Sequence, residues 1–148
     1  MEYFGNKDIL KHRKTGFLSS RKCTAEIVLK SYEWAKQQRA EGNCVVCGNH
    51  SQIEKDVFEI LLKGEQPLVV VLPRGLKKRW DKKWIENAEK GRLLIVSPFD
   101  QEVKRVTRET AIKKNETILS LSEQITIGYK SPNGQLDKLL TGKEFDDV

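Results

Sequence analysis

The chain has 148 residues, of which 38% are hydrophobic and 32% are charged, and its formal net charge is +6. This length suits one domain with a full core and is short for two. No apolar run approaches the roughly 18 residues that a membrane-spanning helix needs, so no membrane partner is expected.

The N-terminus and the cysteines predict the compartment. Residues 1–14 are charged throughout and lack an apolar core followed by a small-residue cleavage site, which argues against export. The three cysteines are an odd number, too few for a disulfide framework, and they fit a reducing compartment. We therefore expect a cytoplasmic protein.

Strands and helices are predicted to alternate along the chain. Short apolar runs predict five strands, at the start of the stretch 16–24 and over residues 43–48, 67–75, 92–99 and 123–130. Amphipathic spacing predicts helices over residues 24–41, 51–64 and 136–140. It also predicts a helix or a broken helix over 76–91, and a segment that is mostly helix over 101–122. In the helix over 101–122, Val106, Ala111, Ile118 and Leu121 are expected to face inward.

This alternation predicts an α/β fold. We expect a Rossmann-like three-layer sandwich with a mainly parallel sheet of about five strands, flanked by helices on right-handed crossovers. One domain over residues 1–148 is predicted, with residues 1–14 as a lead-in segment that packs on the sheet edge and residues 141–148 as an acidic tail.

Polar and small residues follow the predicted strands, where an open α/β sheet binds its ligands. They include Ser19, Ser20, Arg21 and Lys22 after the first strand, Gly48, His50 and Ser51 after the second, Arg74 and Gly75 after the third, Ser97 after the fourth, and Lys130, Ser131, Asn133 and Gly134 after the fifth. Backbone amides near glycines, hydroxyls and arginines are the groups that bind phosphate oxygens. A phosphate-bearing ligand is therefore predicted.

Basic charge is concentrated in two runs. Residues 74–92 contain eight basic and three acidic residues, and a second basic run spans 104–114. Such runs are typical of proteins that bind polyanions, and equally typical of the solvated surface of a lysine-rich protein.

Plainer interpretations of these residues stay open. Gly48 and Gly75 can be turn residues that need a positive φ, and Glu54 can cap the helix that begins near Ser51 or form a buried ion pair with Arg21. His50, Ser51 and Glu54 suggest an acid–base set, but no nucleophile elbow accompanies them. We therefore predict no catalytic residue.

The cysteines and tryptophans are assigned mainly to packing. Cys44 and Cys47 lie three apart in a strand and so point to opposite faces, and no second ligand pair has metal-binding spacing. We expect core packing there, no metal and no cofactor. Trp34 is expected on a helix face, while Trp80 and Trp84 either stack on bases or pack on the sheet.

Several short motifs resemble those of a known family. Ser19-Ser20-Arg21 lies where that family has Gly-Ser-Arg, and Gly75 follows the third strand as a family glycine does. Further matches are Gly48 with Ile53 and Glu54, Lys114-Asn115 with Ile118 and Leu121-Ser122, and Asn133-Gly134-Gln135-Leu136. Over about residues 14–140 the chain resembles the DNA-processing protein A (DprA/Smf) family of bacterial single-stranded-DNA binders. It looks like a stand-alone Rossmann-like domain related to the lysine-decarboxylase-like (LOG) superfamily.

The chain departs from the family pattern at four places. Ser19 replaces the glycine of the first signature, Lys114 replaces the usual arginine, and Glu54 replaces an aspartate. Asn49-His50-Ser51 stands where the family has a small and basic turn.

The resemblance implies non-enzymatic binding of single-stranded DNA, or of another phosphate-bearing nucleic acid, in DNA processing or recombination. The residues expected to bind are Ser19, Ser20, Arg21, Lys22, Gly48, His50, Ser51, Arg74, Gly75, Lys114 and Asn115, with Glu54 as their acidic partner. In the family this binding helps to load the RecA recombinase, which makes a RecA-type recombinase an implied partner. A homodimer stays open.

Two other functions stay open. Related phosphoribohydrolases cleave nucleoside monophosphates with a PGGxGT motif followed by a glutamate, of which residues 131–135 are a poor version without the glutamate. The third alternative is a module that senses a mononucleotide without turnover.

Overall fold

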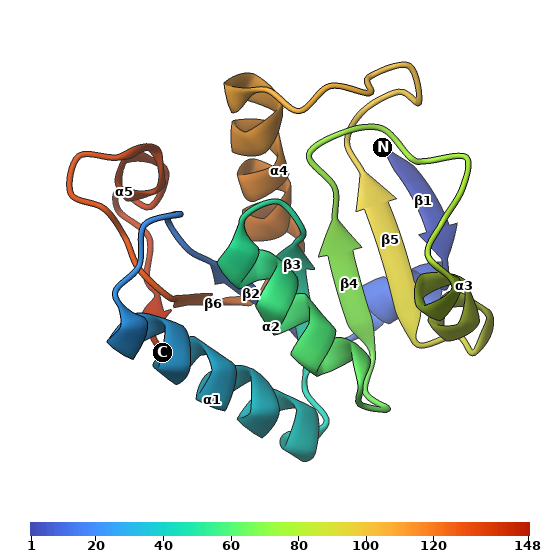
Figure 1. Ribbon diagram of the computed structural model, residues 1–148, viewed down its shortest axis with the longest axis horizontal. Coiled ribbons are helices and arrows are strands. Elements are labelled where there is room, and N and C mark those ends of the chain that lie inside the picture. Colours follow the sequence, from blue (N-terminus) through green and yellow to red (C-terminus); the bar gives the residue numbers. More distant parts are fainter.

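Seven strands of the computed structural model, which describes residues 1–148, form one sheet (Figure 1). They are β1 (Glu2–Gly5), β2 (Lys14–Leu18), β3 (Cys44–Gly48), β4 (Leu68–Val71), β5 (Leu93–Ser97), β6 (Gln124–Ile127) and β7 (Asp146–Asp147). Their order in the sheet is β1-β5-β4-β3-β2-β6-β7. Every neighbouring pair is parallel except β1 with β5.

Helices cover both faces of this sheet. They are the 3₁₀ helix η1 (Lys7–Lys11) and the α-helices α1 (Ala25–Glu41), α2 (Gln52–Leu62), α3 (Lys82–Glu89), α4 (Arg108–Leu121) and α5 (Gln135–Leu139). One apolar cluster lies under α1, α2 and α3, and a second lies under η1, α4 and α5. The predicted Rossmann-like three-layer α/β fold is thereby confirmed. None of the helices combines the length and the apolar character needed to cross a membrane.

The strand order reverses between β2 and β6. From β2 the chain adds β3, β4 and β5 on one side, and then α4 carries it back across the other face to β6 (Figure 1). When the chain reverses its direction along the sheet, a connection of the same handedness must lie on the opposite face. The position of α4 is therefore what right-handed crossovers require. The loops after β2 and β6 therefore diverge from neighbouring strand ends, which is where α/β sheets of this kind form a ligand crevice.

The cysteines of β3 are core residues, as the sequence predicts. Cys47 packs in the cluster under α1, α2 and α3, and Cys44 packs in the cluster on the opposite face. Burial raises the pKa of the Cys44 thiol to about 11, and it also raises the pKa of Cys47. Both thiols are therefore protonated at neutral pH.

The expectation of about five strands is wrong, because the two edge strands were missed. Strand β1 lies within the predicted lead-in and pairs antiparallel with β5, from Glu2 opposite Ser97 to Gly5 opposite Leu94. Strand β7 lies within the predicted acidic tail and consists of two exposed aspartates beside β6. Edge strands need no continuous apolar run, because they are not buried on both faces as the central strands are.

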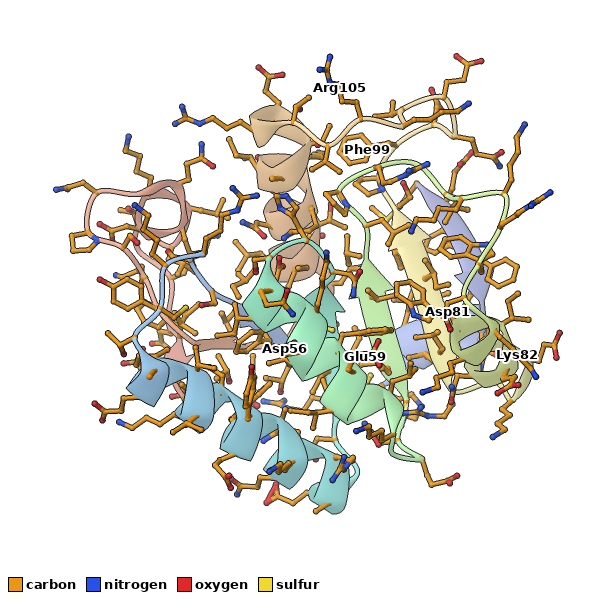
Figure 2. The ribbon with its side chains drawn as sticks, viewed as in Figure 1. Asp56, Glu59, Asp81, Lys82, Phe99 and Arg105 are labelled. Carbon is orange, nitrogen blue, oxygen red and sulfur yellow. The ribbon has the colours of Figure 1, made fainter.

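Two predicted helices begin later than expected. Asp81 caps α3 and Thr107 caps α4 through a capping box with Thr110, so residues 76–81 and 101–107 form loops. Val106 is 39% exposed in the second of these loops and does not face inward, whereas Ile118 is fully buried. Figure 2 shows Phe99 and Arg105 on this same connection between β5 and α4.

The tryptophans pack against other aromatic rings. Trp80 stacks on Phe4 and on Trp84, with ring-centroid distances of 5.7 and 5.8 Å, and Trp84 in turn packs on Phe58 at 4.7 Å. The packing alternative therefore holds for this pair. Trp34 stacks on Phe17 at 5.3 Å, as expected of a helix-face residue.

Candidate functional site

A crevice of about 590 Å³ opens where the strand order reverses. This volume lies within the usual range of small-ligand sites, roughly 300–1,000 Å³. Its walls come from the loops after β2, β3 and β6, from the first turns of α2 and α5, and from the first two turns of α4. The lining residues are Ser19, Ser20, Arg21, Lys22, His50, Ser51, Glu54, Val106, Thr107, Arg108, Ala111, Lys114, Asn115, Ser131, Gly134, Gln135 and Leu136.

One wall is formed by hydrogen bonds between the loops that follow β2 and β6. The Ser20 amide donates to the Tyr129 carbonyl at 2.7 Å, and the Ser20 hydroxyl oxygen accepts from the Ser131 amide at 3.0 Å. The Ser19 hydroxyl oxygen accepts from the Tyr129 amide at 3.1 Å. The two serines therefore hold the wall in shape in addition to facing the crevice.

The floor of the crevice contains a buried ion pair between α4 and α2. The Lys114 ammonium donates to Oε2 of Glu54 at 2.5 Å, and the two side chains are only 4% and 3% exposed. The other carboxylate oxygen of Glu54 accepts from the Ser51 amide at 2.8 Å and from the Ser51 hydroxyl at 3.1 Å. The predicted capping role of Glu54 is thereby confirmed. The alternative of an ion pair with Arg21 is wrong, because the charged partner of Glu54 is Lys114.

Electrostatics keep this pair ionised. Burial alone would raise the pKa of Glu54, but the Lys114 charge and the hydrogen bonds from Lys114 and Ser51 outweigh it and lower the pKa below its usual value. The Lys114 charge is consequently neutralised by Glu54 within the protein.

Gly48 provides the space for the ion pair. A Cβ atom on Gly48 would lie 2.2 Å from Oε2 of Glu54 and 3.0 Å from the Lys114 ammonium. A Cβ atom on Gly75 would lie 2.1 Å from the carbonyl oxygen of Asp100. Neither glycine is among those with a positive φ, so the turn interpretation is wrong for both. Close packing is what excludes a side chain at these positions.

His50 faces Arg21 at the rim of the crevice. Nη2 of Arg21 lies 3.1 Å from Nε2 of His50, and because a guanidinium can only donate, Nε2 accepts and the imidazole is neutral with its proton on Nδ1. Burial lowers the pKa of His50, and the charges of Lys114, Arg21 and Lys55 lower it further against the opposing effect of Glu54. His50 thus pairs with Arg21, while the Ser51 hydroxyl donates to Glu54.

Most of the residues predicted to bind phosphate are brought together. Ser19, Ser20, Arg21, Lys22, His50, Ser51, Lys114, Asn115 and the predicted acidic partner Glu54 all line the crevice, and Gly48 lies directly behind the ion pair. Arg74 and Gly75 do not line it, because they follow β4, which β3 separates from β2. Nε of Arg74 instead donates to the Gly75 carbonyl at 3.3 Å.

The set predicted to bind lacks several residues of the crevice lining. Ser131 and Gly134 were named only as residues that follow a strand, and the others are the polar Thr107, Arg108 and Gln135 and the apolar Val106, Ala111 and Leu136. With the amide oxygen of Gln135 placed toward Arg108, it accepts from Nη2 at 2.9 Å and also from Nε. The Thr107-x-x-Thr110 capping box was the available signal, because it fixes the start of α4 and so places Arg108 at the crevice.

One family model matches the sequence of this chain. The sequence model of the family described as DNA recombination-mediator protein A matches residues 1–136. DNA processing protein A from Helicobacter pylori, a protein studied for its single-stranded DNA binding mode, superposes with a TM-score of 0.76 at 17% identity over 98% of this chain and 69% of its own.

DNA processing protein A from Streptococcus pneumoniae superposes with a TM-score of 0.73 at 20% identity, and the match covers 98% of this chain and 53% of that protein. Identities this low show a shared fold. This chain thus spans about two thirds of the first solved protein and about half of the second. No curated protein sequence matches it.

Breaking the Glu54–Lys114 pair from one side is expected to destabilise the protein. Glu54→Gln leaves the Lys114 ammonium buried without a counter-charge, so the free energy of unfolding should fall by about 3–5 kcal/mol. The double variant Glu54→Leu/Lys114→Met should recover most of this loss. Urea unfolding followed by tryptophan fluorescence measures both.

Glu59→Gln is the matched control for this experiment, because Glu59 is exposed on the same helix (Figure 2). It should change the free energy of unfolding by no more than about 0.5 kcal/mol. A loss of the same small size in Glu54→Gln would contradict the role given to the pair.

His50 is expected to make stability depend on pH. Its pKa is lowered in the fold, while the unfolded chain titrates near the reference value of about 6.5. Below that value the unfolded chain takes up a proton that the folded chain resists, so stability should decrease as pH falls toward the folded pKa. His50→Gln should flatten this slope in urea unfolding between about pH 5 and 7.5. His12→Gln should leave it in place, and a wild-type slope in His50→Gln would refute the assignment.

Proposed function

We propose that this chain, which belongs to the DNA recombination-mediator protein A family, binds single-stranded DNA by its phosphate backbone in the crevice between β2 and β6. The observation that carries the proposal is the charge arrangement of the crevice. Arg21, Lys22 and Arg108 line it, and its one carboxylate, Glu54, is already paired with Lys114. An anion entering the crevice therefore meets exposed cations and no free negative charge.

The polar groups around these cations support the same ligand. Hydroxyls of Ser51 and Thr107 lie at the N-terminal ends of α2 and α4, both of which open on the crevice. Helix N-termini carry partial positive charge and favour phosphate. We assign Arg21 and Lys22 to direct phosphate contact, and His50, Ser51 and Asn115 to the shape of the pocket.

Lys114 has a supporting role in this proposal. Its ammonium is engaged by Glu54 beneath the surface, so it fixes α4 against α2 and thereby places Asn115. Arg74 lies on the same edge of the sheet but outside the crevice, and we assign it at most a peripheral contact with a longer strand.

A nucleotide-sensing role is the second candidate, because the crevice volume of about 590 Å³ also suits a mononucleotide. A thermal shift with a mononucleotide and none with an oligonucleotide would favour sensing over strand binding. The hydrolase alternative needs a free carboxylate, which Glu54 does not offer. Release of free base from a nucleoside monophosphate, lost in Arg21→Ala, would nevertheless favour it.

We further propose that bound DNA is passed to a RecA-type recombinase in the cytoplasm, as the family description of a recombination mediator suggests. A strand-exchange assay with and without the protein tests this step. Whether a homodimer is the active form is tested by the mass of the protein in solution with and without DNA. The recombinase step and the homodimer both depend on DNA binding. If the protein does not bind single-stranded DNA, neither proposal has a basis.

Arg21→Ala is expected to weaken binding of a labelled oligo-dT by about tenfold or more, since a hydrogen bond to a charged group contributes roughly 1.5–3 kcal/mol. The slope of log affinity against log salt should also fall by about 0.7 for the lost phosphate contact on a single strand. Fluorescence anisotropy across a salt series measures both quantities.

Arg74→Ala is the matched control, because it removes the same charge outside the crevice, and it should keep most of the affinity. Equal losses in the two variants would refute the crevice as the binding site. Absence of binding by the wild-type protein at low salt would refute the function itself.

A further inference from the structure

A second cavity of about 610 Å³ lies beside the crevice, between α4 and α5. We call it the α4–α5 groove. Its apolar part is formed by the half-buried Ile112 and Leu139, and the exposed cations Arg108 and Lys138 flank it. Neither cation takes part in an ion pair of the protein.

The groove is continuous with the crevice. Arg108, Asn115 and Gln135 line both cavities, and the contact between Arg108 and Gln135 lies at their junction. A ligand longer than the crevice can therefore extend into the groove without leaving the surface of the protein.

The chemistry of the groove suits one unit of a nucleic-acid strand. An apolar surface can take a base or a sugar, and cations at its sides can take the phosphates that precede and follow it. A free anion alone would leave the apolar surface unused. One carboxylate, Glu109, also lines the groove and opposes an anionic ligand there.

We propose that single-stranded DNA leaves the crevice across the α4–α5 groove, which holds the next nucleotide of the same strand. This inference rests on the proposed function, and it adds the path that the DNA follows over the surface of the protein. A mononucleotide fills the crevice alone. An oligonucleotide contacts both cavities, with Lys138 as a phosphate contact of the longer ligand only.

The test compares thymidine monophosphate with a twelve-residue oligo-dT. Lys138→Glu should weaken oligo-dT binding by about fivefold or more, because it replaces a phosphate contact with a repulsive charge, and it should leave the monophosphate affinity unchanged. Glu109→Gln should strengthen oligo-dT binding, also without an effect on the monophosphate. Lys63→Glu makes the same charge change at the opposite edge of the sheet, after the end of α2, and should have little effect on either ligand.

NMR gives an independent readout. Methyl signals of Ile112 and Leu139 should shift on addition of oligo-dT and not on addition of the monophosphate. Equal effects of Lys138→Glu and Lys63→Glu, or unshifted methyl signals, would overturn this inference. If Arg21→Ala still weakens oligo-dT binding in that case, the proposed function stands alone. If the wild-type protein does not bind oligo-dT at all, both the proposed function and this inference are overturned.

Discussion

The ion pair between Glu54 and Lys114 is the interaction on which the crevice depends. It joins α2 on one face of the sheet to α4 on the other, past the end of β3. Only the missing side chain of Gly48 makes this approach possible. Buried ion pairs often contribute little net stability, because desolvation offsets their attraction, whereas an unpaired partner costs several kcal/mol. The main effect of the pair is therefore to fix how α2 and α4 are placed relative to each other, and its net contribution to the stability of the fold is smaller.

A neutralised floor changes how the crevice can recognise an anion. Lys114 is the most deeply placed cation, yet its charge is matched by Glu54, and the remaining positive charge sits at the exposed rim on Arg21, Lys22 and Arg108. A single phosphate buried at the floor would gain little there. A chain of phosphates that runs along the rim forms a favourable electrostatic interaction with each cation in turn. The crevice therefore favours an extended polyanion over a compact one.

The sequence was most informative about the buried parts of the molecule. Central strands such as β4 and β5, each with four fully buried apolar residues in succession, produce the continuous apolar runs from which they were predicted. Edge strands such as β1 and β7 carry exposed residues and owe their structure to a neighbour's hydrogen bonds, so no local pattern marks them. Strand order is likewise invisible in a local pattern. The sequence therefore predicted that Arg74 and Gly75 follow β4, but it could not predict that β3 separates β4 from the strands that form the crevice.

The serine that replaces the family's glycine at position 19 has a structural explanation. Its hydroxyl accepts from the Tyr129 amide, and Gly128 leaves the room for it, since a Cβ atom there would lie 2.9 Å from the Ser19 oxygen. The extra side chain is thus tied to the neighbouring loop and need not obstruct a ligand. Arg21, two residues later, keeps its exposed place at the rim, so the first signature of the family retains its cation even though its glycine has been exchanged.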